Sequence, residues 1–264
     1  MIPKRAIEEW AEFMSWKSKE FIEQDLIICR ALCQLYKDEY LAEHLALRGG
    51  TTLNKIYLNP QPRYSEDIDL VQIKAEPIKE TIDRIRDALV FIGEPKIKQK
   101  GHNNTLIFRF ESEIPPIIPI RLKVEINTRE HFNVLGLIRH KFEVKNQWYS
   151  GTCQARTYQL EELLGTKVRA LYQRRKGRDL FDLWKVLSTQ NVDIEKIIRC
   201  YREYINFVVD NPPTQKEYLL NMEIKLQDEE FLGDTEMLLR PDENYNPQQA
   251  WELVKKELIE KIVK

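Results

Sequence analysis

The sequence predicts an α+β fold, with a small mixed β-sheet and flanking helices followed by a helical C-terminal half. Two observations predict this class. Strand-like runs of β-branched and aromatic residues are confined to about residues 40–150, and from about Tyr158 onward apolar residues recur only at helical spacing. The 264 residues, 42% of them hydrophobic, suffice for one large domain or two modest ones. We expect domains at 1–155 and 156–264, the second completing a site begun in the first.

The N-terminal elements follow from apolar spacing and turn residues. Helical periodicity predicts one long amphipathic helix from Phe21 to Leu47. A glycine turn at Gly49-Gly50 then leads into a short helix through Leu53 and Ile56. A strand is expected around Ile68 and Leu70-Val71, and Pro77 opens a helix that ends near Phe91.

The remaining strands and helices are equally distinct in pattern. Two strands are expected at 105–110 and 120–126, joined by a proline-rich turn, and 142–144 is an expected edge strand. The C-terminal half then predicts helices over 160–172, 178–187, 194–209, 216–227 and 248–262.

The totals exclude several classes of protein. The formal net charge is −1, so any nucleic-acid contact must come from a local basic patch. No apolar run is long enough to span a membrane, and Glu8, Glu9 and Trp10 occupy the place of a signal-peptide core, so a cytoplasmic protein is expected. The four cysteines and four histidines are scattered and predict neither zinc binding nor a disulfide framework.

Two aspartates form the first candidate site. Asp67 and Asp69 alternate along an apolar strand, so both side chains point to the same side of the sheet. Placing two carboxylates together is costly without a cation between them, and Mg²⁺ commonly combines such carboxylates with substrate phosphates. An Asp-x-Asp pair also occurs by chance at solvated strand ends.

The glycine turn lies just upstream of the aspartates. Gly49 and Gly50, followed by Thr51, precede a helix N-terminus, where unpaired N–H groups and the dipole favour a phosphate. The turn also fits a plain strand-to-helix junction. Neither a Walker lysine nor a G-x-G-x-x-G pattern is present, which excludes a P-loop ATPase and a Rossmann site.

Two further groups of residues carry possible chemistry. Glu125, on the polar face of the 120–126 strand, could complete a three-carboxylate site, or pair with a lysine or arginine across the sheet. The segment from Lys167 to Arg178 holds six basic residues and no acid, which indicates a local anion site or a solvated loop. Asp179 and Asp182 are three residues apart and share one helix face.

Taken in order, these motifs resemble the AbiEii/AbiGii toxin family of nucleotidyltransferases, which have the DNA polymerase β-like fold. The resemblance rests on G-G-T-x-L, S-x-D-x-D, K-V-R-A-L and R-D-x-x-D-L, between about Leu47 and Leu187. It implies a small mixed-sheet nucleotidyltransferase core, and a toxin of type IV-like toxin–antitoxin and abortive-infection systems with a cognate antitoxin as partner.

The resemblance also implies roles for particular residues. The ligands of Mg²⁺, or alternatively Mn²⁺, would be Asp67, Asp69 and Glu125. The residues that would bind the nucleoside triphosphate (NTP) are Arg48, Gly49, Gly50, Thr51, Ser65 and Lys167. Asp179 or Asp182 would complete catalysis from the helical half. Some relatives add nucleotides to the 3′ end of tRNA, so an RNA acceptor is expected.

In the implied reaction an acceptor hydroxyl, activated by a metal or by Glu125, attacks the α-phosphorus and pyrophosphate leaves. Three other readings of the sequence remain open. A small-molecule, antibiotic-type nucleotidyltransferase would need an acidic pocket, a catalytically silent binding module would have lost a carboxylate, and a metal-dependent nuclease would leave the glycine turn unexplained.

Overall fold

The computed structural model describes residues 2–262, which form two compact units. The N-terminal unit comprises the chain up to Asn133 together with Leu137–Tyr158. The helical unit comprises Val134–Gly136 and the chain from Gln159 onward. The expected division into domains at 1–155 and 156–264 stays a prediction.

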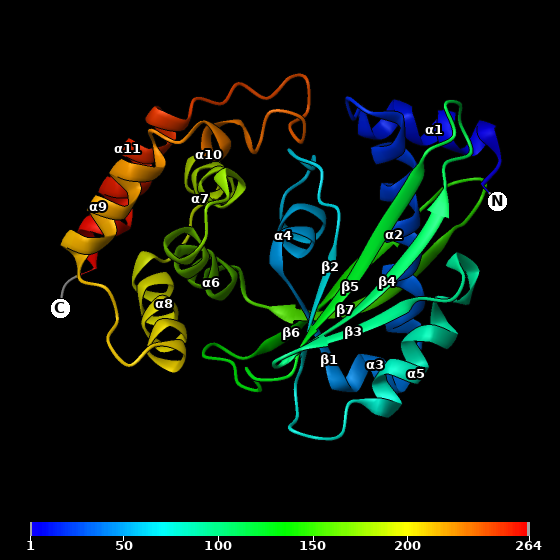
Figure 1. Cartoon of the computed structure of the whole chain (residues 1–264), viewed down its shortest axis with the longest axis horizontal. Coiled ribbons are helices and arrows are strands. Elements are labelled where there is room, and N and C mark those ends of the chain that lie inside the picture. Colours follow the sequence, from blue (N-terminus) through cyan, green and yellow to red (C-terminus); the bar gives the residue numbers. More distant parts are fainter. Residues whose placement is uncertain (1, 263–264) are drawn as a thin grey trace. The chain divides into compact units, whose positions relative to one another are not determined.

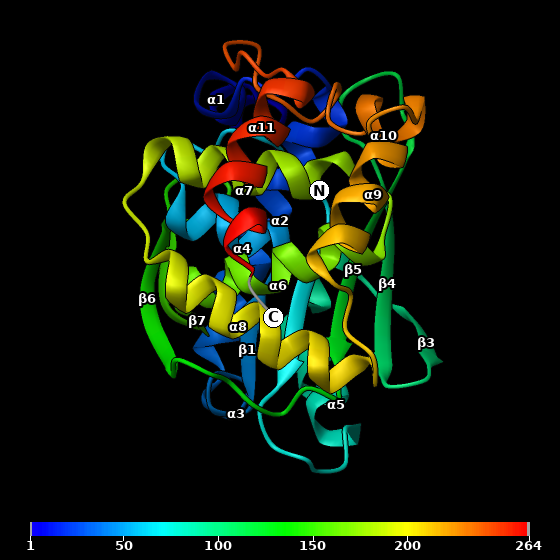
Figure 2. The same cartoon turned by 90° about the vertical axis from the view of Figure 1, so that its left-hand side faces the viewer.

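A seven-stranded mixed sheet is the centre of the N-terminal unit (Figure 1). Its strands, in chain order, are β1 (Leu45–Arg48), β2 (Ile68–Gln72), β3 (Lys96–Lys100), β4 (Asn103–Glu111), β5 (Pro119–Asn127), β6 (Leu137–Val144) and β7 (Gly151–Tyr158). Their order across the sheet is β3-β4-β5-β2-β1-β7-β6, so β3 and β6 form opposite edges (Figure 2). β2–β5 and β1–β7 are parallel pairs and the other pairs are antiparallel.

Alternating residues give β5 one buried apolar side and one partly exposed polar side. In β5, Leu122, Val124 and Ile126 are buried, whereas Lys123 and Glu125 between them are partly exposed. Alpha helices α1 (Lys4–Met14), α2 (Lys19–Lys37), α3 (Glu39–His44) and α5 (Lys79–Ala88) lie on one side of the sheet (Figure 1). The helical segment after β1, α4 (Gly49–Thr52) continued by the π-helical turn Leu53–Tyr57, lies on the other.

The long helix expected from Phe21 to Leu47 is wrong at its C-terminal end. α2 ends at Lys37, and the Asp38 carboxylate accepts a hydrogen bond from Leu41 N at 2.8 Å to cap the short α3. The three residues before Arg48 are buried in β1, between β2 and β7. A short fully apolar run fits a buried strand as well as a helix, and here its neighbours in the sheet decide.

The other strands and helices expected in this unit are present with shifted ends. The helix from Pro77 is α5, followed by a 3-10 turn at Val90–Ile92, and the 142–144 edge strand is the end of the longer β6. The sequence pattern did not predict α1, β3 or β7. All residues of β3 are exposed, so the strand lacks the alternation of buried apolar and exposed polar residues by which a strand is recognised.

The helical unit contains the expected helices. They are α6 (Leu160–Gln173), α7 (Gly177–Thr189), α8 (Ile194–Val208), α9 (Gln215–Lys225), the additional α10 (Glu229–Gly233) and α11 (Pro247–Glu257), followed by a 3-10 turn at Ile259–Lys261. Close packing of α6 on α8 depends on Gly165, where a Cβ would lie 2.6 Å from that of Cys200. Within residues 2–262, none of the helices has the length and apolarity needed to cross a bilayer.

Candidate active site

The two aspartates stand at the start of β2, on its partly exposed side. Ile68 and Leu70 are buried on the opposite side, as alternation requires. Asp69 is the cross-strand partner of Glu125 on the parallel strand β5, so the two side chains share a face. The sheet thus places the three predicted acids on one face of neighbouring strands.

A lysine that the sequence analysis did not assign to the site lies among these acids. Lys123 Nζ is 3.0 Å from Asp67 Oδ2 and 3.8 Å from Glu125 Oε1. Burial raises the pKa of Asp67 to about 6, and the charge of Lys123 opposes that rise. The carboxylates therefore interact with a cation supplied by the chain itself.

No three acidic, histidine or cysteine side chains group closely enough to hold a metal among the described residues. A divalent ion at Asp67 and Asp69 would need further oxygen ligands from substrate phosphates or water. Mg²⁺ is commonly bound in this way, through one or two carboxylates, so the donor chemistry fits. Glu125 as a third ligand stays a prediction.

The glycine turn closes against the second aspartate. Gly49 has φ +78°, and a Cβ there would lie 2.0 Å from Asp69 Oδ2. A side chain at this position would both strain the backbone and displace the carboxylate. Gly49 therefore allows Asp69 to lie directly against the start of the helical segment.

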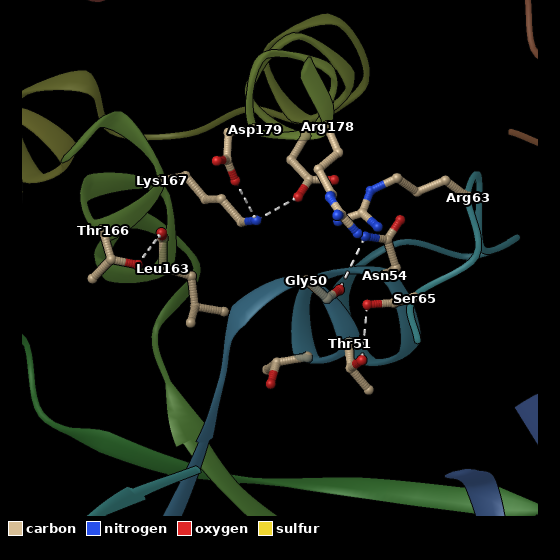
Figure 3. Close-up of polar contacts among 12 residues, drawn as sticks. Gly50, Thr51, Asn54, Arg63, Ser65, Leu163, Thr166, Lys167, Arg178 and Asp179 are labelled. Carbon is tan, nitrogen blue, oxygen red and sulfur yellow. Dashed lines mark hydrogen bonds and ion pairs between the residues drawn. The ribbon is translucent and has the colours of Figure 1, made fainter. Parts of the chain in front are cut away.

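Gly50 has two polar neighbours on its other side (Figure 3). A Cβ at Gly50 would lie 2.5 Å from Arg63 Nη2 and 3.1 Å from Ser65 Oγ. The buried Arg63 donates from Nη1 to Tyr64 O at 2.8 Å. Close approach of a guanidinium and a hydroxyl to the turn makes this backbone suitable for an anion.

Hydroxyl groups fix the turn to the strand that carries the aspartates. The hydroxyls of Thr51 and Ser65 are hydrogen-bonded at 2.9 Å (Figure 3), and Thr51 also donates to Asp67 O. Both residues are buried. Asn54 Nδ2 donates to Gly50 O at 3.0 Å, which further orders the turn. Direct phosphate contacts by Thr51 and Ser65 stay predictions.

Arg48 forms an ion pair with an acid that no sequence motif indicated. Its Nη1 forms an ion pair with Glu130, which is buried in the turn after β5. Asn127 Oδ1 accepts from Glu130 N at 2.9 Å and holds that turn. Neither Arg63 nor Glu130 belongs to a recognisable motif, and an arginine two residues before S-x-D-x-D was the available signal for the first.

In the helical unit, Lys167 is a buried lysine held by both predicted aspartates. Its Nζ is 2.9 Å from Asp179 Oδ1 (Figure 3). The same Nζ is 2.8 Å from Asp182 Oδ2. All three side chains are almost completely buried, and they come from α6 and α7. The spacing of Asp179 and Asp182 on one helix face, as predicted, brings both carboxylates to the same ammonium group.

Asp179 also binds an arginine. Arg174 Nε and Nη2 donate to its two carboxylate oxygens at 2.6 and 2.7 Å. Burial alone would raise the pKa of Asp179, but Lys167 and Arg174 lower it below its ordinary value. Asp179 is thus an ionised carboxylate that holds two cations in place.

Three other members of the predicted basic run are paired with acids of their own unit. Arg175 lies 3.3 Å from Asp228, and Arg178 lies 3.3 Å from Asp234. Lys176 contacts Asp234 at 3.4 Å. These two acids flank α10, far along the sequence, and neutralise much of the positive charge of the run.

Comparison with known proteins identifies the family. The model of the "Nucleotidyl transferase AbiEii toxin, Type IV TA system" family matches residues 30–257. The chain belongs to the AbiEii family. It is therefore a nucleotidyltransferase of a toxin family, as the motifs indicated, and this family generally uses an NTP and a divalent metal ion.

Solved structures support the AbiEii fold. The MenT4 nucleotidyltransferase toxin of Mycobacterium tuberculosis H37Rv superposes with a TM-score of 0.59 at 15% identity, covering 97% of this chain and 88% of that one. JHP933 from Helicobacter pylori gives 0.52 at 19% identity, covering 93% and 94%. At these identities the likeness concerns the fold alone. No curated protein sequence matches the chain.

Proposed function

We propose that this AbiEii protein transfers a nucleoside monophosphate from an NTP to an acceptor hydroxyl, in a reaction that depends on Mg²⁺ or alternatively Mn²⁺. The observation that carries the proposal is the contact between Asp69 and Gly49, beside Asp67. This contact places two carboxylates, which can bind a cation, next to the N-terminus of a helical segment. A helix N-terminus favours the binding of phosphate.

The proposed metal ligands are Asp67 and Asp69. Both carboxylates lie on the partly exposed side at the start of β2, and the Lys123 ammonium, 3.0 Å from Asp67, would give up that carboxylate to the metal. When bound, the metal would neutralise charge on the triphosphate and activate the acceptor oxygen. Backbone N–H groups at Gly49 and Gly50 would orient the phosphates, with Arg63 and Ser65 fixing the turn.

The proposed chemistry is an in-line displacement. The acceptor oxygen forms a bond to the α-phosphorus, the bond from that phosphorus to the bridging oxygen breaks, and pyrophosphate leaves with the bonding electrons. Glu125, on the same face as Asp69, is a candidate to accept the hydroxyl proton. Lys167 is proposed to offset phosphate charge, and Asp179 and Asp182 to hold its ammonium group in place.

The proposed acceptor is RNA, specifically the 3′ end of tRNA, and the proposed inhibitory partner is an antitoxin. Membership of a type IV toxin family supports an antitoxin partner. The proposal of an RNA acceptor rests on the reaction that the family resemblance implies.

Substitution of the aspartates tests the reaction. Asp67→Ala or Asp69→Ala should reduce labelling of total cell RNA by an α-³²P NTP at least about 100-fold, because the metal loses half of its carboxylate ligands. Asp87→Asn, an exposed acid on α5, is the matched control and should label normally.

Each NTP should be assayed separately with Mg²⁺ and total RNA. Wild-type rates in either aspartate variant would contradict the site assignment. Transfer by the wild type to an aminoglycoside but not to RNA would instead establish the small-molecule alternative.

A further inference from the structure

A row of unpaired cations crosses β3, β4 and β5, the three strands at one edge of the sheet. Strand register places Lys96 opposite Ile107, which is itself opposite Lys123, and places Lys98 opposite Thr105. Side chains directly opposite one another share a face of the sheet. Five exposed cations therefore stand on the face that carries the candidate acids. We call this set the basic strip: Lys96, Lys98, Lys100, Arg109 and Arg121.

Two members of the basic strip face each other directly. Arg109 on β4 is the cross-strand partner of Arg121 on β5, and both are exposed. Like charges in this position destabilise a sheet. Among residues 2–262, no carboxylate lies within 4.0 Å of any basic-strip side chain. A bound polyanion would remove the repulsion between Arg109 and Arg121.

The basic strip adjoins the candidate active site. Lys98, Thr105, Glu125 and Asp69 follow one another across four neighbouring strands in register. Arg121 lies two residues from Lys123, which contacts Asp67. A ligand on the strip would therefore reach the proposed catalytic acids along one continuous face of the N-terminal unit.

The dimensions and composition of the strip favour a chain of phosphates. Lys96 and Lys100 are separated by about 14 Å along an extended strand, which exceeds the size of one phosphate group. None of the residues that β3, β4 and β5 place on this face is aromatic, so bases have no ring on which to stack. Such a surface contacts the backbone of a nucleic acid and does not read its sequence.

The other basic segment of the chain contrasts with the strip. Arg175, Lys176 and Arg178 in the helical unit have acidic partners, and the formal net charge of the whole chain is −1. The strip therefore concentrates unneutralised positive charge on one face of a nearly neutral protein. Charge complementarity selects a polyanionic partner for that face.

We propose that the basic strip binds the sugar–phosphate backbone of the acceptor RNA and leads its end to Asp67 and Asp69. This inference rests on the proposed function and adds the location of the acceptor surface. It assigns Arg109 and Arg121 to substrate binding, with no part in the chemical step.

The test is the double variant Arg109→Gln/Arg121→Gln. Loss of two phosphate contacts should raise the KM for RNA roughly tenfold and lower the slope of log(kcat/KM) against log[salt] by about 1.4 to 1.8. The kcat at saturating RNA and the KM for the NTP should stay unchanged. The control variant Lys74→Gln/Lys79→Gln removes two exposed cations that follow the C-terminal end of β2, and it should change none of these quantities.

The outcomes separate this inference from the proposed function. Wild-type protein that labels no RNA would overturn both. Wild-type protein that labels RNA, together with an unchanged KM and salt slope in Arg109→Gln/Arg121→Gln, would overturn the surface alone. A single-stranded DNA of the same sequence as competitor should inhibit the wild type more strongly than the double variant, because the strip contacts phosphates.

Discussion

At the scale of the single residue, the carboxylate of Asp67 is partly buried and lies next to the ammonium group of Lys123. Burial raises its pKa to about 6, so protons compete with any metal ion below that pH. Metal affinity should therefore fall about tenfold per pH unit below 6 and level off above it. Titration of Mn²⁺ into the protein between pH 5 and 8 measures this, and Asp67→Asn should show a flatter profile.

Lys123 gives a second prediction at this scale. Its ammonium group lies 3.0 Å from Asp67 and must yield that carboxylate when a metal ion binds. Lys123→Gln removes the competing cation, and because such a partly exposed pair contributes about 1 kcal/mol, metal affinity should rise about fivefold. Calorimetric titration of Mn²⁺ checks it; weaker binding would mean that Lys123 assists the metal or its ligands.

The residues differ in how far the sequence could predict them. Gly49, Asp67 and Asp69 belong to short motifs, since their roles depend on local backbone conformation and strand alternation. Lys123 and Arg63 could not be assigned in this way. Their positions depend on pairing between distant strands and on the path of the 58–67 loop, which no local pattern specifies.

At the scale of the element, a buried ion pair joins α2 to the helical segment after the glycine turn. Lys55 Nζ contacts Asp25 Oδ1 at 2.6 Å, and Trp10 Nε1 donates to Asp25 Oδ2 at 3.0 Å. Burial lowers the pKa of Lys55, but the charges and hydrogen bonds of Asp25 and Cys29 together outweigh burial, so the net shift of the pKa is upward. This pair fixes the segment that begins at Gly49.

Lys55→Met should destabilise the protein by about 3–5 kcal/mol, because it leaves the Asp25 carboxylate buried without its cation. Urea unfolding followed by circular dichroism measures the loss. The double variant Lys55→Met/Asp25→Leu should recover much of it, and an equally unstable double variant would contradict a charge-based explanation.

Elements with long, regular periodicity could be predicted, and short ones could not. The helices of the C-terminal half repeat apolar residues over several turns, whereas β1 is four residues long and wholly apolar or basic. The turn acids Asp228 and Asp234 neutralise the basic run only through tertiary contacts. The charge on that segment was therefore overestimated from its local sequence.

At the scale of the whole molecule, membership of the AbiEii toxin family predicts an effect on cells. Induced expression of the chain should arrest bacterial growth, and Asp69→Asn, expressed to the same level, should grow like the empty vector. Colony counts after induction, with immunoblots for protein amount, measure this. Equal toxicity of the variant would show that inhibition does not require nucleotide transfer.

The position of β7 has a consequence for how the protein is made. β1 lies between β2 and β7, and the Thr157 hydroxyl donates to Leu47 O at 2.9 Å across 110 residues of sequence. During translation, the strand that leads into the glycine turn keeps one edge unpaired until the last strand of its unit leaves the ribosome. Premature termination before Gly151 would therefore yield a fragment prone to aggregation, in which the glycine turn lacks its second flanking strand.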